Sequence, residues 1–205
     1  IAAYFIKKFY KKKHELTGVH TSTWPYSIGL ILPLGLTFFS PSATILSPSI
    51  NPDRTFIGGI SNGGFMAYKI ACEKTEMFKA MASVIGTMSK YSWDSCSPSQ
   101  PISVLQISSL DDDVVPINGI EQNEWGWGGA PEMDIIINFW KDFNQANDGY
   151  QANINDFTQG FYYKGGINNS QVWYYKVDEL GHDLPKENKH GINVADKLWE
   201  FFSQF

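Results

Sequence analysis

The residues with the clearest chemical potential lie in the turn Gly59–Gly63, which reads G-I-S-N-G. The turn follows the run 54–58, which has the β-branched and aromatic content of a short buried strand. It precedes a segment, 64–73, whose apolar and small residues fit one packed face of a helix. A G-x-S-x-G turn between a strand and a helix is the setting of a nucleophile elbow, which aims the serine hydroxyl into a cleft. We therefore predict that Ser61 is a nucleophile and that the backbone N–H of Asn62 is one oxyanion donor.

A nucleophilic serine needs a base and an acid, and two later predicted strands lead to suitable residues. The strand 102–107 runs into the aspartates 111–113, and the strand 171–177 is followed by His182. The carboxyl ends of parallel strands meet at one edge of a sheet, so these groups are expected to meet there. The order Ser…Asp…His is that of the α/β-hydrolases. His182 alone among the four histidines follows a predicted strand directly and is the predicted base, whereas the residues by themselves leave the choice among the aspartates open.

Strands that alternate with helices predict an α/β-hydrolase-like fold, with a mainly parallel sheet flanked by helices. Further predicted elements are a strand over 78–86, a helix over 131–143, a hairpin or excursion within 145–169, and a closing helix within 192–205. The expected apolar face of the helix 131–143 comprises Ile135, Ile136, Phe139 and Trp140. His190 is assigned to a polar loop before the last helix, and 89–100 to a loop without regular structure.

Residues 1–43 are assigned to no domain, and residues 44–205 to the catalytic domain. A Lys-rich stretch, the apolar run 28–39 and the small residues 40–43 follow the outline of a secretory signal. The basic stretch is long for a signal and the run contains Pro and Gly, so a buried strand or core segment is the preferred interpretation. The run is shorter than the roughly 20 residues that span a bilayer, so no stable membrane insertion is expected.

Composition excludes several classes of function. The net charge of −5 argues against general nucleic-acid binding, which needs a basic surface. Cys72 and Cys96 permit one disulfide without requiring it, and neither belongs to a Cys/His cluster of the kind that binds zinc. The aspartates 111–113 lack the spacing of a calcium loop. We therefore predict no metal and no cofactor.

Four segments together carry a resemblance to a known family: Asn51–Arg54, the G-I-S-N-G-G-F-M-A-Y stretch of Gly59–Tyr68, Asp112–Pro116, and Gly181-His182. The chain resembles the poly(3-hydroxybutyrate) depolymerase-like and feruloyl esterase-like group of α/β-hydrolases, from about Ile50 to the C-terminus. The family's D-x-x-V-P pattern falls on Asp112–Pro116, so the resemblance implies Asp112 as the acid. It also implies a secreted or periplasmic serine carboxylic-ester hydrolase that acts on short polyesters, on feruloylated or acetylated polysaccharides, or on small esters.

The chain also departs from that family. It has Ser108-Ser109 where the family usually has His-Gly, and Leu184 where the family has an aromatic residue. The family's early strands and oxyanion loop have no counterpart in residues 1–43, so the second oxyanion donor stays unassigned. One alternative is therefore a non-catalytic or weakly active binding module, with Trp125 and Trp127 as stacking surfaces for sugars or aromatics, although plain packing explains these residues equally well. The other alternative is a serine peptidase of the same fold.

Overall fold

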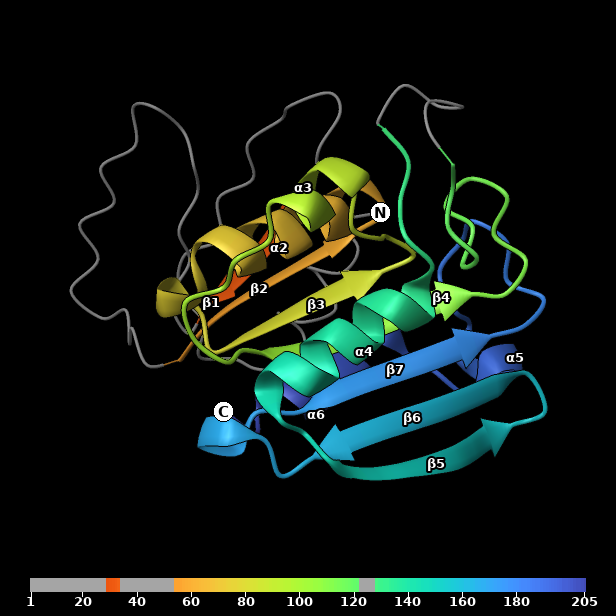
Figure 1. The fold of residues 1–205 in the computed structure, drawn as a ribbon. Helices are drawn as coiled ribbons and strands as arrows, with labels where there is room; N and C mark the ends of the chain where they lie inside the picture. The colour runs from red at the N-terminus through yellow and green to blue at the C-terminus, as the bar shows by residue number, and fades with distance from the viewer. Residues whose placement is uncertain (1–28, 34–53, 122–127) are drawn as a thin grey trace.

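The computed structural model describes residues 29–33, 54–121 and 128–205. Within them, one sheet has the strand order β1-β2-β3-β4-β7-β6-β5 (Figure 1). Its strands are β1 (Gly29–Pro33), β2 (Thr55–Ile60), β3 (Ala80–Val84), β4 (Ser103–Ser109), β5 (Asp148–Asn155), β6 (Thr158–Lys164) and β7 (Val172–Val177). The α-helices are α2 (Asn62–Glu73), α3 (Lys90–Asp94), α4 (Met133–Asn144), α5 (Glu187–His190) and α6 (Val194–Phe202).

The middle of the sheet is parallel and both flanks are antiparallel. Strands β2, β3, β4 and β7 pair in parallel, because each pair is joined by a crossover that contains a helix. Strand β1 pairs antiparallel with β2, and the β5–β6 hairpin adds antiparallel to β7. The central parallel strands and the hairpin within 145–169 agree with the sequence prediction. As a result, the carboxyl ends of β2, β4 and β7 lie along one edge of the sheet.

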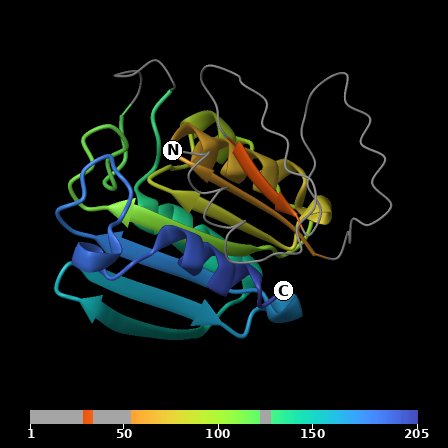
Figure 2. The same ribbon diagram turned by 180° about the vertical axis from the view of Figure 1, so that it is seen from behind.

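Helices cover both faces of the sheet and close two apolar cores. Helices α2, α3 and α4 lie on one face, and α6 lies on the other, as Figures 1 and 2 show. Neighbouring strand residues alternate between the two cores: Val104 packs with α2 and α4, whereas Leu105 packs with α6. A disulfide between Cys72 and Cys96 joins the end of α2 to the segment after α3. The disulfide that the sequence left optional is therefore formed.

Three sequence predictions about local structure were wrong. Ile135 is 48% exposed, and Ile137 is buried in its place beside Ile136 and Trp140, because the buried stripe of α4 is rotated from the predicted face. The segment 89–100 contains the short helix α3, whose N-cap Ser89 accepts a hydrogen bond from the backbone N–H of Ser92. His190 is buried at the end of the short helix α5 rather than in a polar loop. Helices this short have too little hydrophobic periodicity to be recognised in a sequence.

The N-terminal predictions fall mostly outside the described residues. Strand β1 lies within the apolar run 28–39, in keeping with the strand interpretation of that run. The Lys-rich stretch and the small residues 40–43 are not among the described residues. In the part of the chain that the structure describes, no helix combines the length and apolarity needed to cross a bilayer.

Candidate active site

The turn after β2 has the backbone of a nucleophile elbow. Ser61 has φ 52° and ψ −120°, a region that residues with a side chain rarely adopt. Its N–H donates to the carbonyl of Val84 on β3 at 2.9 Å, and its carbonyl accepts from the N–H of Gly64 at 2.8 Å. The strained serine is thus held between the sheet and the first turn of α2.

Glycines allow this turn because no side chain fits beside it. A Cβ atom on Gly59 would lie 2.1 Å from the carbonyl carbon of Gly63, so strand and helix can pass only without it. A Cβ atom on Gly86, in the loop after β3, would lie 2.6 Å from the carbonyl oxygen of Ser61. Both contacts are with backbone atoms, which cannot rotate away, so the elbow depends on glycine at these positions.

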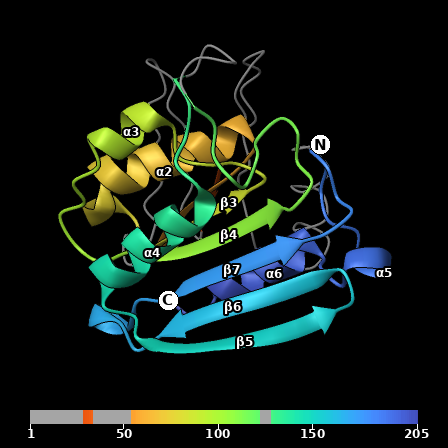
Figure 3. The same ribbon diagram turned by 45° about the vertical axis from the view of Figure 1, so that its right-hand side comes forward.

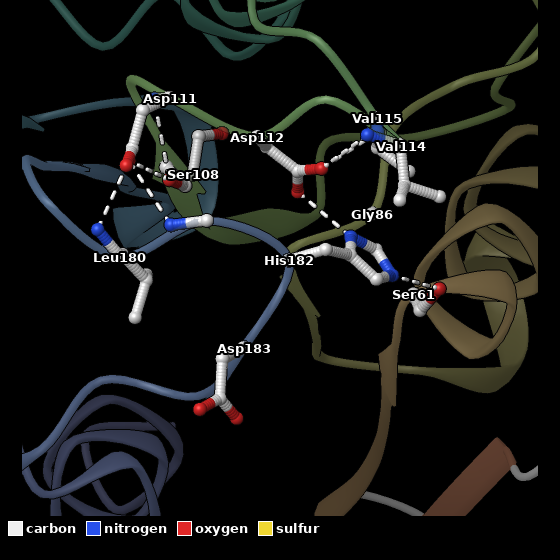
Figure 4. A network of polar contacts seen from close by, with 12 residues as sticks. Ser61, Gly86, Ser108, Asp111, Asp112, Val114, Val115, Leu180, His182 and Asp183 are labelled. Atoms are coloured by element: carbon white, nitrogen blue, oxygen red, sulfur yellow. Dashed lines mark hydrogen bonds and ion pairs between the residues drawn. The ribbon is translucent and has the colours of Figure 1, made fainter.

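Asp112 is the carboxylate that faces the imidazole. It follows β4 and is only 5% exposed. Its Oδ1 accepts hydrogen bonds from the backbone N–H groups of Val114 at 2.9 Å and Val115 at 2.8 Å. Its Oδ2 lies 2.8 Å from Nδ1 of His182 (Figure 4). The structure therefore brings together with His182 the aspartate that the family resemblance had selected.

His182 completes a continuous chain of hydrogen bonds. Its Nε2 lies 2.9 Å from Oγ of Ser61, across 121 positions of sequence. Because an ionised Asp112 can only accept, Nδ1 carries the hydrogen and the lone pair of Nε2 faces the Ser61 hydroxyl. Ser61 therefore donates to His182, and His182 donates to Asp112 (Figure 4). The three side chains come from the ends of β2, β4 and β7.

The two aspartates next to Asp112 differ in their contacts. Oδ1 of Asp111 accepts from the N–H groups of Leu180 at 2.9 Å and Gly181 at 3.0 Å, and from the hydroxyl of Ser109 at 2.7 Å. The bonds from Gly181 and Ser109 lower the pKa of Asp111 to about 2. Asp113 is exposed. The sequence predicts both as turn or capping residues, since nothing local shows that the peptides bound by Asp111 lie 69 and 70 positions away.

A buried amide beneath the elbow escaped sequence reasoning. Gln106, fully buried in the middle of β4, accepts from the Tyr68 hydroxyl of α2 at 3.0 Å. Its Nε2 donates to the carbonyl of Gly86 at 2.9 Å and to Oγ of Ser108 at 2.9 Å. Burial raises the pKa of Tyr68, so its hydroxyl stays a donor. An amide side chain inside the otherwise mostly apolar strand 102–107 was the available signal.

Some predicted site residues cannot be placed. Trp125 and Trp127 lie outside the described residues, as does any oxyanion donor from residues 1–28. Asn62 is the exposed first residue of α2, where the predicted N–H donor belongs.

A cavity of about 480 Å³ between α3 and the start of α4 is lined by Trp93, Glu121 and Ile135 among others, and by none of the three hydrogen-bonded side chains. Among the described residues, no group of three or more His, Cys, Asp or Glu could hold a metal.

Comparison with known proteins found two similarities. Residues 43–112, less than half of the chain, match the prolyl oligopeptidase family. A solved structure described as a thermostable esterase is similar at 15% sequence identity and a TM-score of 0.39, over 76% of this chain and 29% of that one. The chain thus spans less than a third of the length of that structure. No curated protein matches the chain.

The sheet and the elbow after β2 are those of an α/β-hydrolase fold, in agreement with the prolyl oligopeptidase match over residues 43–112. The predicted fold class is confirmed. The finer resemblance to polyester depolymerases and feruloyl esterases stays a prediction.

Proposed function

We propose that this protein is a serine carboxylic-ester hydrolase that works through an acyl-enzyme on Ser61. The observation that carries the proposal is the hydrogen-bonded chain Ser61–His182–Asp112, with Ser61 in a strained turn. An isolated serine hydroxyl is a poor nucleophile at neutral pH, and an adjacent imidazole within hydrogen-bond reach is what activates it.

In the acylation step, Oγ of Ser61 attacks the ester carbonyl carbon while Nε2 of His182 takes the hydroxyl proton. Asp112 stabilises the imidazolium that forms and keeps its Nδ1–H oriented. The tetrahedral intermediate then collapses, His182 returns the proton to the leaving alkoxide, and the alcohol departs. The acyl group stays on Ser61.

In the deacylation step, a water molecule takes the place of the alcohol. Nε2 of His182 removes a proton from that water, and the resulting hydroxide attacks the acyl carbonyl. Collapse returns the proton to Oγ of Ser61 and releases the carboxylic acid. In both steps the carbonyl oxygen becomes negatively charged, and we propose the N–H of Asn62, at the N-terminus of α2, as one donor to it.

The substrate class we propose is a short polyester, a feruloylated or acetylated polysaccharide, or a small ester. The resemblance of the segments around Ser61, Asp112 and His182 to depolymerase-like and feruloyl esterase-like enzymes supports it. A secreted or periplasmic location is part of the proposal. The Cys72–Cys96 disulfide supports it, because disulfides persist mainly in oxidising compartments.

Hydrolysis of aryl esters of increasing acyl length, together with labelling by a fluorophosphonate, tests the proposal. Wild type should hydrolyse the shorter esters and be labelled on Ser61, whereas Ser61→Ala should lose labelling and about 10⁶-fold in kcat. Ser89→Ala, at the N-cap of α3, is the matched control and should keep both. Turnover that survives in Ser61→Ala would refute the mechanism. Sugar or aromatic binding without turnover by wild type would favour the non-catalytic binding module.

A serine peptidase is the second candidate, because residues 43–112 match the prolyl oligopeptidase family. The same three side chains can cleave an amide if His182 protonates the leaving amine. Anilides and esters that share one acyl group separate the two activities. A kcat/KM for the anilide equal to or above that for the ester would favour the peptidase.

A further inference from the structure

The loop that carries His182 has one residue, Glu179, in a backbone conformation that its residue type does not favour. Glu179 has a φ of 50° and Gly181 a φ of 62°, both in the left-handed region. Such a conformation at a residue other than glycine costs of order 1–3 kcal/mol and persists only where the surroundings hold it. Contacts from outside the loop must therefore fix the path of the chain into His182.

Asp111 supplies such contacts from the acid loop. Its Oδ1 receives the backbone N–H groups of Leu180 and Gly181, the two residues immediately before His182 (Figure 4). The hydroxyl of Ser109 donates to the same oxygen and fixes the rotamer of the carboxylate. Hydrogen bonds to an ionised acceptor are about twice as strong as neutral ones, so this exposed side chain is an effective anchor.

A second anchor holds the other side of the same loop. Nδ1 of the buried His190 accepts from the N–H of Lys186 at 2.9 Å, so the hydrogen of the neutral ring is on Nε2. That Nε2 donates to the carbonyl of Glu179 at 3.3 Å. The Lys189 ammonium donates to the same carbonyl at 3.2 Å. The loop is thus held at the carbonyl of Glu179 by α5 and at the next two backbone amides by Asp111.

Two consecutive residues, Asp111 and Asp112, therefore hold His182 in two ways. Asp112 holds the imidazole by its Nδ1, and Asp111 holds the peptides through which the chain enters the residue. We propose that Asp111 is a positioning residue, whose carboxylate sets the distance from Nε2 of His182 to Ser61 by fixing the backbone at Leu180 and Gly181. The proposal rests on the proposed function, because the positioning matters only if His182 is the base. A displacement of 1 Å in a catalytic group can cost about 100-fold in rate.

Two matched substitutions separate the place of the acceptor from its charge. Asp111→Asn keeps an oxygen at the position of Oδ1 and removes the charge, whereas Asp111→Glu keeps the charge and displaces it by one methylene. For a short aryl ester, Asp111→Asn should retain kcat within about fivefold, and Asp111→Glu should lose about 10–100-fold with KM almost unchanged. Asp113→Glu, at the exposed neighbour, is the control and should match wild type. The proposal would be overturned if Asp111→Glu had the same kcat as the Asp113→Glu control, or if Asp111→Asn lost as much kcat as Asp111→Glu.

Hydrogen exchange and imidazole NMR on the full chain give a readout that needs no turnover. The amides of Leu180 and Gly181 should exchange slowly in wild type and Asp111→Asn, and at least tenfold faster in Asp111→Glu. The ¹⁵N shifts of His182 should show one Nδ1–H tautomer in the first two proteins and a mixture in the third. If wild type has no esterase activity but these differences appear, the proposed function fails and the positioning stands. Identical exchange and identical shifts in all three proteins would refute the positioning even where the ester is hydrolysed.

Discussion

The turn that carries Ser61 (the serine side) and the loop that carries His182 (the histidine side) are fixed by different kinds of contact. On the serine side, the contacts that fix the geometry are backbone against backbone: Gly59 against Gly63, and Gly86 against the carbonyl of Ser61. They involve no charged side chain; the contact between Gly59 and Gly63 is local, whereas Gly86 reaches Ser61 from the loop after β3. The elbow is therefore fixed by the absence of side chains.

On the histidine side, the contacts are polar and long-range. Asp111 and Asp112 each bond, through a carboxylate, to the loop of His182 across 69 or 70 positions. Glu179 keeps its positive φ because of bonds from outside the loop. Ser61 is thus held by steric exclusion and His182 by hydrogen-bond acceptors, so substitutions and pH should affect the two regions differently.

The largest effect should come from changing the acceptor of the base without changing its shape. In Asp112→Asn the amide can still accept from Val114 and Val115, but it presents N–H₂ to the imidazole. His182 must then carry its hydrogen on Nε2 and cannot accept from Ser61. We expect about a 10⁴-fold loss of kcat for an aryl ester, with the melting temperature shifted by only a few degrees. A kcat loss below tenfold would show that the carboxylate of Asp112 does not control the chemistry through His182.

The next effect should come from filling the space that the elbow leaves empty. Gly59→Ala places a methyl group against the backbone of Gly63, and we expect the free energy of unfolding to fall by about 3 kcal/mol or more. Gly58→Ala is the matched control in the same strand, because its nearest contact is an ordinary 3.6 Å and its cost should stay below about 1 kcal/mol. Urea unfolding followed by tryptophan fluorescence measures both. Equal costs would mean that the close approach at Gly59 is not what fixes the elbow.

Acid should weaken the histidine side before the serine side. The pKa of Asp111 is about 2 in the folded protein and 3.8 without its partners, so its stabilising contribution is complete above pH 4 and is lost as the pH falls from about 4 to about 2. The difference in unfolding midpoint between wild type and Asp111→Asn should therefore shrink over that window. The difference between wild type and Gly59→Ala should not. A difference in unfolding midpoint between wild type and Asp111→Asn that stays constant from pH 7 to pH 2 would contradict this account.

The smallest effect is expected at a buried hydroxyl behind the elbow. Oγ of Ser83 is buried beneath Gly64 and Gly86, and it has no hydrogen-bond partner within the described structure. Ser83→Ala should change the free energy of unfolding by less than about 1 kcal/mol, with stabilisation as the expected sign. Ser83→Thr keeps the hydroxyl but adds a methyl group in this narrow space and should destabilise. Thermal unfolding of the pair measures both, and a loss above 2 kcal/mol in Ser83→Ala would reveal a bond that this arrangement does not contain.

The elements that local sequence patterns predicted are those with their own periodicity or turn chemistry. The glycines at 59 and 63 pointed to the elbow, and the segment 192–205 to α6, which buries Val194, Leu198, Phe201 and Phe202. The stripe of α4 was placed one residue off at Ile135, because the sequence 133–137 is apolar on several sides and only packing chooses the buried one. The burial of His190 was not predicted, because it comes from the fold. Its hydrogen-bond partners, Lys186 and Glu179, are close in sequence and by themselves do not indicate burial.

The sequence by itself determined the strand–turn–helix around Ser61 and the chain order of the serine, the aspartates and the histidine, because these depend on local propensity and on the order of parallel strands. The family resemblance pointed to Asp112 as the acid, but only the tertiary structure decided which group each carboxylate faces. Asp111, Asp112 and Asp113 are chemically identical and adjacent, so their own chemistry does not distinguish them. Their roles differ because the turn after β4 directs one toward the imidazole of His182, one toward the amides before it, and one into solvent.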